Sequence, residues 1–280
     1  MTINITNSAI STSTLSHRID FAIGNYSDYV NLNVGVTSTT YIVPSGWVNA
    51  ITGSDSGICT MTLSTYSSGT FVGSKSYSVT IQVPSSMKPT IGSVTTTRID
   101  NSVPSGWGIY VQGKSGVTIT ANNCSGVNGS TITKYVISGG MSATQSTNSF
   151  TLNPIQSYGT ITFTITITDS RGQTASQSVS IYVYAYSVPS ITNTEAYKCT
   201  SNGTRSSSGR YLALKMTATY TTLGNNNSLA LRAYYRVMGA STWTYATALT
   251  SGVTTIIGGS LDPEQNYEVE FVAADSLSTV

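Results

Sequence analysis

A nucleotide-binding motif is the most explicit chemical signal in the sequence. Residues Gly108 to Ser115 read Gly-Ile-Tyr-Val-Gln-Gly-Lys-Ser and match the phosphate-binding pattern GxxxxGK[ST]. That loop needs a buried strand before the glycines and a helix after them, because main-chain N–H groups and the helix N-terminus must face the phosphates. Here residues 109–111 are themselves strand-like, and residues 117–121 are rich in β-branched side chains. The sequence therefore predicts a Gly-Lys-Ser-Gly turn between two strands.

Acid–base catalysis finds no supporting set of residues. The only histidine, His17, stands next to Arg18 at the expected start of a strand, and serines occur along the whole chain. A catalytic nucleophile needs a base and an orienting carboxylate beside it, and no Ser-His-Asp set stands out. Acidic residues near the C-terminal end are expected at a corner and on an outer strand face, where Arg232 and Arg236 can meet them across a sheet: Asp262, Glu264, Glu268 and Glu270. We expect no enzyme and no cofactor.

Neither the cysteines nor the carboxylates predict a metal site. Cys59, Cys124 and Cys199 form no CxxC pair and are odd in number, so neither a zinc site nor a disulfide within one domain is indicated. Cys59 lies on the apolar face of a strand pattern and is predicted to be a small core residue. Residues 100–101 (Asp-Asn) and 122–123 (Asn-Asn) offer oxygens for a calcium ion at a domain junction. Their spacing is not that of an EF-hand, and we predict no bound metal.

Aromatic side chains are the best candidates for a binding surface. Tyr182, Tyr184 and Tyr186 share one side of an expected strand, where they can stack on a sugar or protein ligand or pack against the next domain. The pentapeptide Val-Pro-Ser-Gly-Trp occurs twice and ends at Trp47 and at Trp107. Pro, Ser and Gly are residues that favour turns, so the repeat predicts that the same turn is used twice. The alternative is that each tryptophan forms the tip of an aromatic binding site.

Two octapeptides one hundred positions apart reveal the elements that position these residues. Residues 76–83 read SYSVTIQV and residues 176–183 read SQSVSIYV, and a proline and an isoleucine follow each at the same spacing. Aliphatic residues alternate with polar ones in both, which is the period of a half-buried strand. The repeat indicates that one domain closes with a strand, a proline linker follows, and a new domain begins. The interval matches the size of an immunoglobulin-like sandwich.

The predicted fold class is all-β, with tandem immunoglobulin-like and fibronectin type III-like β-sandwiches. Immunoglobulin-like sandwiches are expected over residues 1–86 and 87–187, and a fibronectin type III-like sandwich over residues 188–280. Turn-forming Gly, Asn, Asp and Ser clusters separate the expected strands. These strands cover residues 18–23, 31–36, 58–63, 75–83, 117–120, 135–137, 160–168, 177–183, 211–220, 229–237 and 267–272.

The last predicted sandwich has a corner signature and an incomplete end. Leu261 and Tyr267 resemble the EF corner of fibronectin type III domains, in which the tyrosine hydroxyl bonds back to the main chain. Fourteen residues lead from Asp169 to Val183 in the central sandwich, whereas five residues follow Asp275. We therefore predict that the last strand is absent and that the chain is part of a longer polypeptide.

The composition limits the classes of partner. Charged residues make up 9% of the 280 residues and the net charge is +2, with no basic run, so no nucleic acid or anionic lipid surface is expected as a ligand. The longest apolar stretches have the length of strands, which predicts no membrane insertion. The N-terminus lacks the basic and apolar regions of a signal peptide.

One run of the sequence resembles a known family. Residues 98–115 (RIDNSVPSGWGIYVQGKS) are similar to a run in minor structural tail proteins of siphophages that infect Gram-positive bacteria, and residues 63–73, 129–135 and 164–172 continue the likeness. The resemblance implies a non-enzymatic virion protein of the tail or tail tip, near the host-recognition apparatus. It supplies no catalytic residues.

The resemblance and the strand pattern together predict a structural module that spaces or displays other tail parts, facing outward on the virion. Other phage tail proteins are the expected partners, and a host cell-wall glycan or surface protein is a further candidate. The alternative is a cell-surface adhesin or carbohydrate-binding module that grips glycans with its aromatic side chains. No coiled-coil heptads set an oligomeric state, which stays open.

Overall fold

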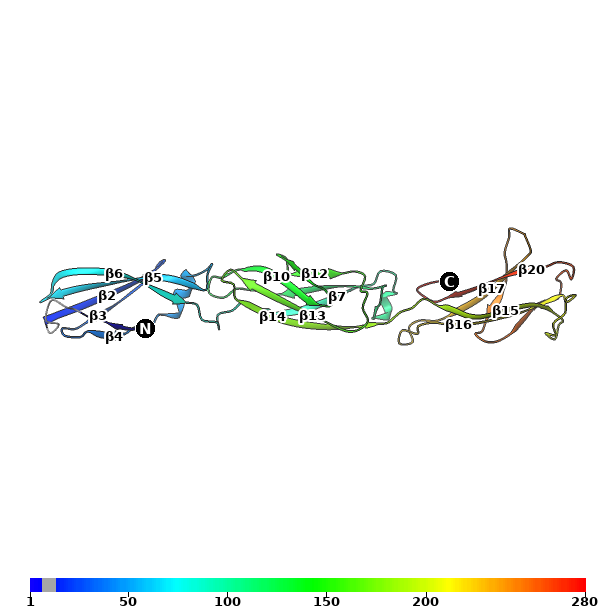
Figure 1. Cartoon of the computed structure of the whole chain (residues 1–280), viewed down its shortest axis with the longest axis horizontal. Helices are drawn as coiled ribbons and strands as arrows, with labels where there is room; N and C mark the ends of the chain where they lie inside the picture. The colour runs from blue at the N-terminus through cyan, green and yellow to red at the C-terminus, as the bar shows by residue number, and fades with distance from the viewer. Residues whose placement is uncertain (7–13) are drawn as a thin grey trace. The chain divides into compact units, whose positions relative to one another are not determined.

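The computed structural model describes residues 1–6 and 14–280, and in these ranges the protein is built of β-strands and short 3-10 helices (Figure 1). Two of these helices are η2 (Ser45–Ala50) and η3 (Ser105–Trp107). The all-β prediction is confirmed. Within the described ranges, no helix has the length and apolar character needed to cross a bilayer.

The N-terminal sheets are formed by residues 2–82. A four-stranded antiparallel sheet has the order β3-β2-β5-β6, and a two-stranded sheet pairs β1 with β4. Figure 1 shows β2, β3, β5 and β6 side by side. Their bounds are β1 Thr2–Asn4, β2 Leu15–Ile23, β3 Tyr26–Leu32, β4 Ser38–Thr40, β5 Ser56–Ser67 and β6 Thr70–Gln82.

Alternation along β2 explains how these sheets enclose a core. Ile19, Phe21 and Ile23 are buried, whereas the residues between them are partly or fully exposed. Phe21 stacks on Tyr41 with a distance of 4.0 Å between ring centroids. The same core includes Ile3 of β1, so the inner faces of both sheets contribute to it. This period-two burial is what a sandwich requires.

The central sheets are formed by residues 93–184. One has the order β11-β10-β13-β14-β8 and the other the order β12-β9-β7. Along β13 the residues at positions 161, 163, 165 and 167 are buried, as the Ile-Thr alternation predicts. The bounds are β7 Ser93–Ile99, β8 Tyr110–Val111, β9 Gly116–Asn122, β10 Ile132–Gly139, β11 Ala143–Gln145, β12 Ser149–Leu152, β13 Gly159–Asp169 and β14 Thr174–Tyr184.

The C-terminal sheets are formed by residues 190–274, with the orders β15-β16-β19 and β18-β17-β20. Leu212, Leu214 and Met216 of β16 pack with Leu231 and Leu261 in a core that both sheets share. The bounds are β15 Ser190–Cys199, β16 Tyr211–Thr219, β17 Ala230–Val237, β18 Thr244–Leu249, β19 Thr255–Gly258 and β20 Tyr267–Ala274.

One predicted strand is wrong in position. The expected strand over residues 31–36 lies earlier, as β3 (Tyr26–Leu32), and a turn occupies residues 33–36. Gly24, with φ of 55°, and Asn25 form a two-residue turn that pairs Ile23 with Tyr26. Because such a short turn starts the return strand at once, the strand ends before Gly35, whose φ is 79°. The other predicted strands overlap observed ones.

The chain forms two compact units. One contains residues 1–96, 119–150 and 162–179, and the other contains residues 97–118, 151–161 and 180–280. All contacts described below lie within one or the other unit. The boundaries at residues 86 and 187, and the missing last strand, stay predictions.

Candidate functional site

The phosphate-motif segment is a closed turn between strands. β8 precedes the turn and β9 follows it directly, as the sequence predicts. The Val111 N–H donates to the buried Ser115 Oγ at 3.0 Å, and the Gly113 N–H donates to the Ile155 carbonyl at 2.7 Å. The Lys114 and Ser115 N–H groups both donate to the Val111 carbonyl. With these amides engaged inside the protein and no helix after them, the segment offers no phosphate cradle.

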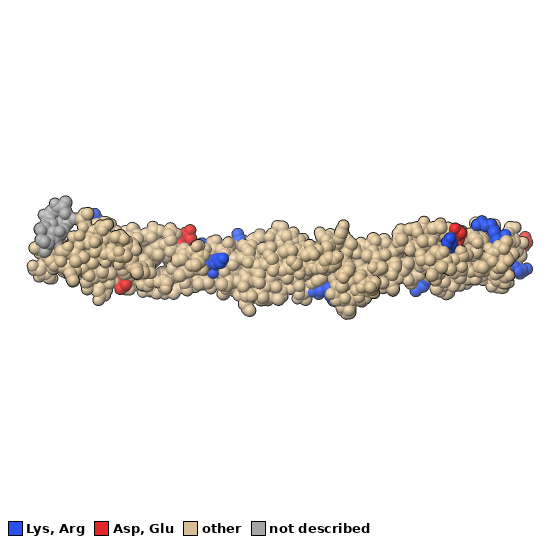
Figure 2. All heavy atoms as spheres, turned by 90° about the horizontal axis from the view of Figure 1, so that it is seen from below, with Lys and Arg blue, Asp and Glu red and all other residues tan. Residues whose placement is uncertain are grey.

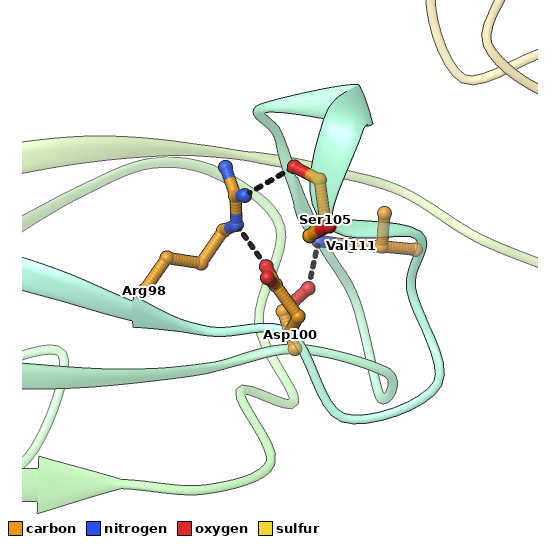
Figure 3. Close-up of polar contacts among 5 residues, drawn as sticks. Arg98, Asp100, Ser105 and Val111 are labelled. Atoms are coloured by element: carbon orange, nitrogen blue, oxygen red, sulfur yellow. Dashed lines mark hydrogen bonds and ion pairs between the residues drawn. The ribbon is translucent and has the colours of Figure 1, made fainter.

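The loop between β7 and β8 is held by Arg98, as Figure 3 shows. The Arg98 Nε donates to the Asp100 carboxylate, and its Nη2 donates to the Ser105 carbonyl at 3.0 Å. Asn101, the neighbour of Asp100, donates through Nδ2 to Asn153 Oδ1 at 2.7 Å. Asp100 Oδ1 thus accepts from Arg98, and Asn101 Oδ1 accepts from the Asn153 Nδ2 at 3.4 Å, so two of the candidate calcium-ligating side chains bond within the protein. Among the described residues, no group of three or more His, Cys, Asp or Glu side chains is placed to hold a metal ion.

Three of the five predicted aromatic residues meet in one apolar cluster. Trp107, Tyr184 and Tyr186 pack around Val111 and Leu223. The buried members of this cluster have low exposed fractions, 0% for Val111 and 1% for Leu223. The residues come from η3, β8, β14 and the segments at 186 and 223, so the fold joins chain positions more than one hundred residues apart. We call this group the junction cluster.

A polar network continues the junction cluster. The Tyr186 hydroxyl donates to Asp275 Oδ1 at 3.2 Å, and burial next to this carboxylate raises the pKa of Tyr186 to about 12. The Asn227 Nδ2 donates to Asp275 Oδ2 at 2.9 Å. The Lys114 ammonium lies 5.4 Å from the centroid of the Tyr186 ring and donates to the Leu277 carbonyl at 3.4 Å. The Tyr186 hydroxyl and the Lys114 ammonium thus bond to Asp275 and Leu277, and the rings of Tyr184 and Tyr186 pack in the junction cluster.

Tyr182 and Trp47 lie outside the junction cluster. Tyr182 is 58% exposed, and its ring meets the Tyr184 ring edge to face at 5.1 Å between centroids. Trp47 is 4% exposed and packs in the core of the N-terminal sheets. Of the five candidates, Tyr182 is the one with a largely exposed ring.

The repeated pentapeptide forms the same turn at both places. Pro44 and Pro104 precede η2 and η3 with φ of −60° and −56° and ψ of 134° and 127°. The N–H of Trp47 donates to the Pro44 carbonyl at 3.0 Å, and the N–H of Trp107 donates to the Pro104 carbonyl at the same distance. The prediction of a reused turn is confirmed.

The acidic residues near the C-terminal end have structural roles. Arg236 Nε lies 2.5 Å from Glu268 Oε2, opposite it across the β17–β20 pair, and its guanidinium stacks 4.3 Å above the Trp243 ring. Glu270 faces Tyr234 in the register, so the expected pairing holds for one glutamate. The Tyr267 hydroxyl accepts from the Asp262 N–H at 2.9 Å, which confirms the predicted corner.

The histidine and two of the three cysteines are buried, and Cys124 is partly buried. His17 is 3% exposed, and its Nδ1 lies 3.0 Å from Thr65 Oγ1, while burial lowers its pKa. Cys59 is buried in the core of the N-terminal sheets, as predicted. All three cysteines of the chain are free thiols, and burial raises their pKa values. A thiol held protonated is a weak nucleophile.

The residue that sequence reasoning missed is Arg171. It sits in the turn after β13, is 4% exposed, and donates from Nε to the Ile51 carbonyl at 2.6 Å. Its Nη1 donates to the Val127 carbonyl at 2.8 Å, and its Nη2 donates to the Val48 carbonyl at 3.1 Å and to the Asn128 carbonyl. The guanidinium thus ties together three chain segments of one compact unit. An arginine in an Asp-Ser-Arg-Gly turn is normally solvated, so the sequence held no signal for this role.

Few charges interrupt the surface. Figure 2 shows one face of the molecule, on which Lys, Arg, Asp and Glu atoms are scattered among uncharged ones. This face displays no broad patch of positive or of negative charge. This distribution agrees with the low charged fraction of the sequence, 9%.

Solved structures with some likeness to the chain are multi-domain proteins. The three N-terminal domains of the highly immunogenic outer capsid protein of bacteriophage RB49 are 11% identical, with a TM-score of 0.36, and the match covers 98% of this chain and 88% of that chain. Domains A168–A170 of titin are 9% identical, with a TM-score of 0.36, and the match covers 99% and 93%. Similarity this low has no bearing on function. No curated protein matches the chain.

A protein-family comparison is more informative. Residues 1–204 match the family described as "Siphovirus protein of unknown function (DUF859)", which confirms the siphophage resemblance of the sequence. The match extends over most of the chain and includes the Arg98 loop, the Gly108–Ser115 turn and Arg171. The chain belongs to this family of siphovirus proteins.

Proposed function

We propose that this chain is a non-enzymatic structural module of a siphophage tail or tail tip, which spaces or displays other tail parts. The observation that carries the proposal is that several groups capable of chemistry bond to other parts of the fold. The amides of the phosphate-motif turn, the Asp275 carboxylate and the Glu268 carboxylate all bond to other parts of the chain. A module of this kind needs stable sheets and free surfaces rather than a reactive pocket.

Virion labelling tests the tail assignment. Antibodies raised against residues 1–280 would be applied to purified phage particles and imaged by electron microscopy. We expect label at the tail or tail tip. Label on the capsid, or protein found only in the lysate and not in particles, would refute the proposal. Detection of the chain by mass spectrometry of the same particles is the internal control.

A phosphatase assay tests the non-enzymatic part separately. Purified protein would be incubated with ATP and with GTP, and phosphate release would be compared with that of Lys114→Ala. We expect no release from either protein, because the turn amides are already bonded. Release by the unmodified chain that disappears in Lys114→Ala would show that the turn opens to bind nucleotide.

The second candidate function is glycan binding, and the exposed ring of Tyr182 favours it. An exposed aromatic plate beside a second ring is a surface on which a sugar can stack. Host cell walls would be mixed with the protein and with Tyr182→Ala, and the bound fraction measured by sedimentation. Tyr158→Ala is the matched control, since Tyr158 is 65% exposed and lies outside the tyrosine row. Saturable binding that only Tyr182→Ala weakens would establish this added role, and Trp107→Ala would then test the junction cluster.

A further inference from the structure

The N-terminal and central sheets match strand by strand, with one difference. In chain order, β2, β3, β5 and β6 take the places of β10, β11, β13 and β14 in the larger sheet. In the smaller sheet β1 and β4 take the places of β9 and β12. The central sheets have two further strands, β7 beside β9 and β8 beside β14, and the described residues of the N-terminal sheets supply no counterpart to either.

The missing counterparts leave two strand edges without a partner in the described ranges. β1 pairs on one side with β4, where the Met1 carbonyl and the Ile5 N–H bond to Tyr41 and Thr37. In an antiparallel ladder the intervening residues direct their N–H and C=O groups to the other side. In β1 these are Thr2 and Asn4, which therefore point to an open edge. β6 likewise pairs with β5 alone.

The core beneath these edges is incompletely covered. In the central sheets the inner residues of β13 are buried, with Phe163 and Ile165 at 0% exposure. On β5, the equivalent strand, Cys59 is buried but Met61 and Leu63 are only partly buried. Tyr77 of β6, which pairs with Met61 in the register, is 43% exposed. The inner face of the larger sheet is thus buried in the central sheets and only partly buried in the N-terminal sheets.

Two hollows occupy the uncovered strip. One, of about 290 Å³, lies between β1 and the inner face of the larger sheet, against Ile3, Met61, Leu63 and Tyr77. The other, of about 270 Å³, lies at the end of β6 against Val79, Ile81 and the core aromatic residues. The side chains lining both are apolar or uncharged, and Lys75 stands beside Tyr77 with its ammonium 5.4 Å from that ring. We call this strip the β1–β6 groove.

We propose that the β1–β6 groove accepts an extended segment of another virion polypeptide, which adds a strand beside β1. Main-chain groups of the segment would bond to Thr2 and Asn4, and its alternate apolar side chains would cover Met61, Leu63 and Tyr77. In strand addition of this kind, main-chain hydrogen bonds between the strands provide affinity, and pockets for alternate side chains provide specificity. Because the Lys75 ammonium lies beside the Tyr77 ring and adds positive charge next to the groove, the segment is uncharged or acidic. The choice of a virion partner rests on the proposed function, whereas strand acceptance is testable without the virion.

A synthetic peptide tests strand acceptance directly. The probe is the segment Ser93–Val111 of this chain, which contains the strands that fill the equivalent places in the central sheets. Its binding to the protein of residues 1–280 would be followed by calorimetry, and amide exchange at Thr2 and Asn4 by NMR. We expect saturable binding that slows exchange at these two amides at least tenfold, and no binding of a scrambled peptide.

Matched variants locate the site. Tyr77→Glu places a charge in the groove at a half-exposed position, and we expect it to weaken peptide binding at least tenfold. Ile58→Glu is the control, because Ile58 is 60% exposed and lies on the opposite face of neighbouring β5. Absence of saturable peptide binding, or equal effects of the two variants, would refute the acceptor site while leaving the tail assignment untouched.

Two further outcomes would also overturn the inference. Slow exchange at Thr2 and Asn4 in the free protein would mean that the chain itself covers the edge. Self-association in sedimentation that Tyr77→Glu abolishes would make a second copy, rather than another virion polypeptide, the occupant. A photo-crosslinker placed at Tyr77 in assembled particles should instead join the groove to an extended segment of a different tail protein.

Discussion

At the residue scale, this protein uses its few polar and charged side chains to close its own structure. Lys114 completes the letter pattern of a phosphate loop, yet its ammonium contacts Tyr186 and Leu277. The flanking residues favour strands, and the predicted turn between two strands is observed. Sequence reasoning could not find Arg171, because burial of that side chain depends on carbonyl groups at residues 48 and 51, over one hundred positions away. The residues next to Arg171 in the sequence therefore give no sign of its distant hydrogen-bond partners.

Arg171→Ala should destabilise the compact unit to which it belongs. The change removes the guanidinium hydrogen bonds to the carbonyls of Val48, Ile51 and Val127 inside the fold, and such a loss costs about 3 kcal/mol. The free energy of unfolding, measured by urea denaturation, should fall by about that amount. Arg232→Ala is the control because Arg232 is exposed, and it should change the same quantity by less than about 0.5 kcal/mol. Equal effects of the two variants would contradict the role of Arg171.

Tyr186 should give the junction cluster a dependence on alkaline pH. The pKa of Tyr186 is about 12 in the folded protein and about 10 in an unfolded chain. Its contribution to stability is therefore complete below pH ~10 and is lost as the pH rises through the folded pKa. Tyr186→Phe removes this titration. The difference in the free energy of unfolding between the two proteins should shrink from about pH 10 upward, and a difference independent of pH would contradict the assignment.

At the element scale, the same pentapeptide turn serves two different environments. The Pro-Ser-Gly-Trp sequence sets the 3-10 turn at η2 and at η3, but burial of the tryptophan depends on what the neighbouring sheets provide. Trp47 enters a core and Trp107 enters the junction cluster. The local geometry was therefore predictable from sequence, and the destination of each ring was not. The misplaced strand has a related cause. Val34 and Val36 continue the alternation of a strand in the sequence, although β3, which starts directly after the Gly24–Asn25 turn, ends at Leu32.

The two tryptophans should differ in their effect on stability. Trp47→Ala removes a 4% exposed ring from a core and should cost about 3–5 kcal/mol of unfolding free energy. Trp107 is only partly buried, so Trp107→Ala should cost less than half as much. Urea unfolding of both variants checks this order. A greater cost for Trp107→Ala would mean that the junction cluster stabilises the protein more than the core of the N-terminal sheets does.

At the scale of the whole molecule, the repeat spaced by one hundred residues predicted the strand-rich architecture and the siphophage resemblance predicted the family. Both signals lie in the pattern of side chains along the chain. The β1 and β6 edges that have no strand partner among the described residues could not be predicted in the same way, because strand pairing depends on which strands lie side by side in the fold.

Low charge should make the stability of the whole molecule insensitive to salt. The ion pairs of the described residues are partly exposed: Arg18–Asp20, Arg98–Asp100, Lys215–Glu195 and Arg236–Glu268. Pairs of this kind contribute ~0–1 kcal/mol each, and salt screens them within a Debye length of ~10 Å or less. Between about 0.05 M and about 0.5 M sodium chloride, the unfolding temperature should therefore move by less than about 3 °C, the shift expected from ~1 kcal/mol. Scanning calorimetry measures this directly. A larger fall at high salt that Arg236→Ala removes would show that the surface pairs, rather than the apolar cores and the buried Arg171, hold the molecule together.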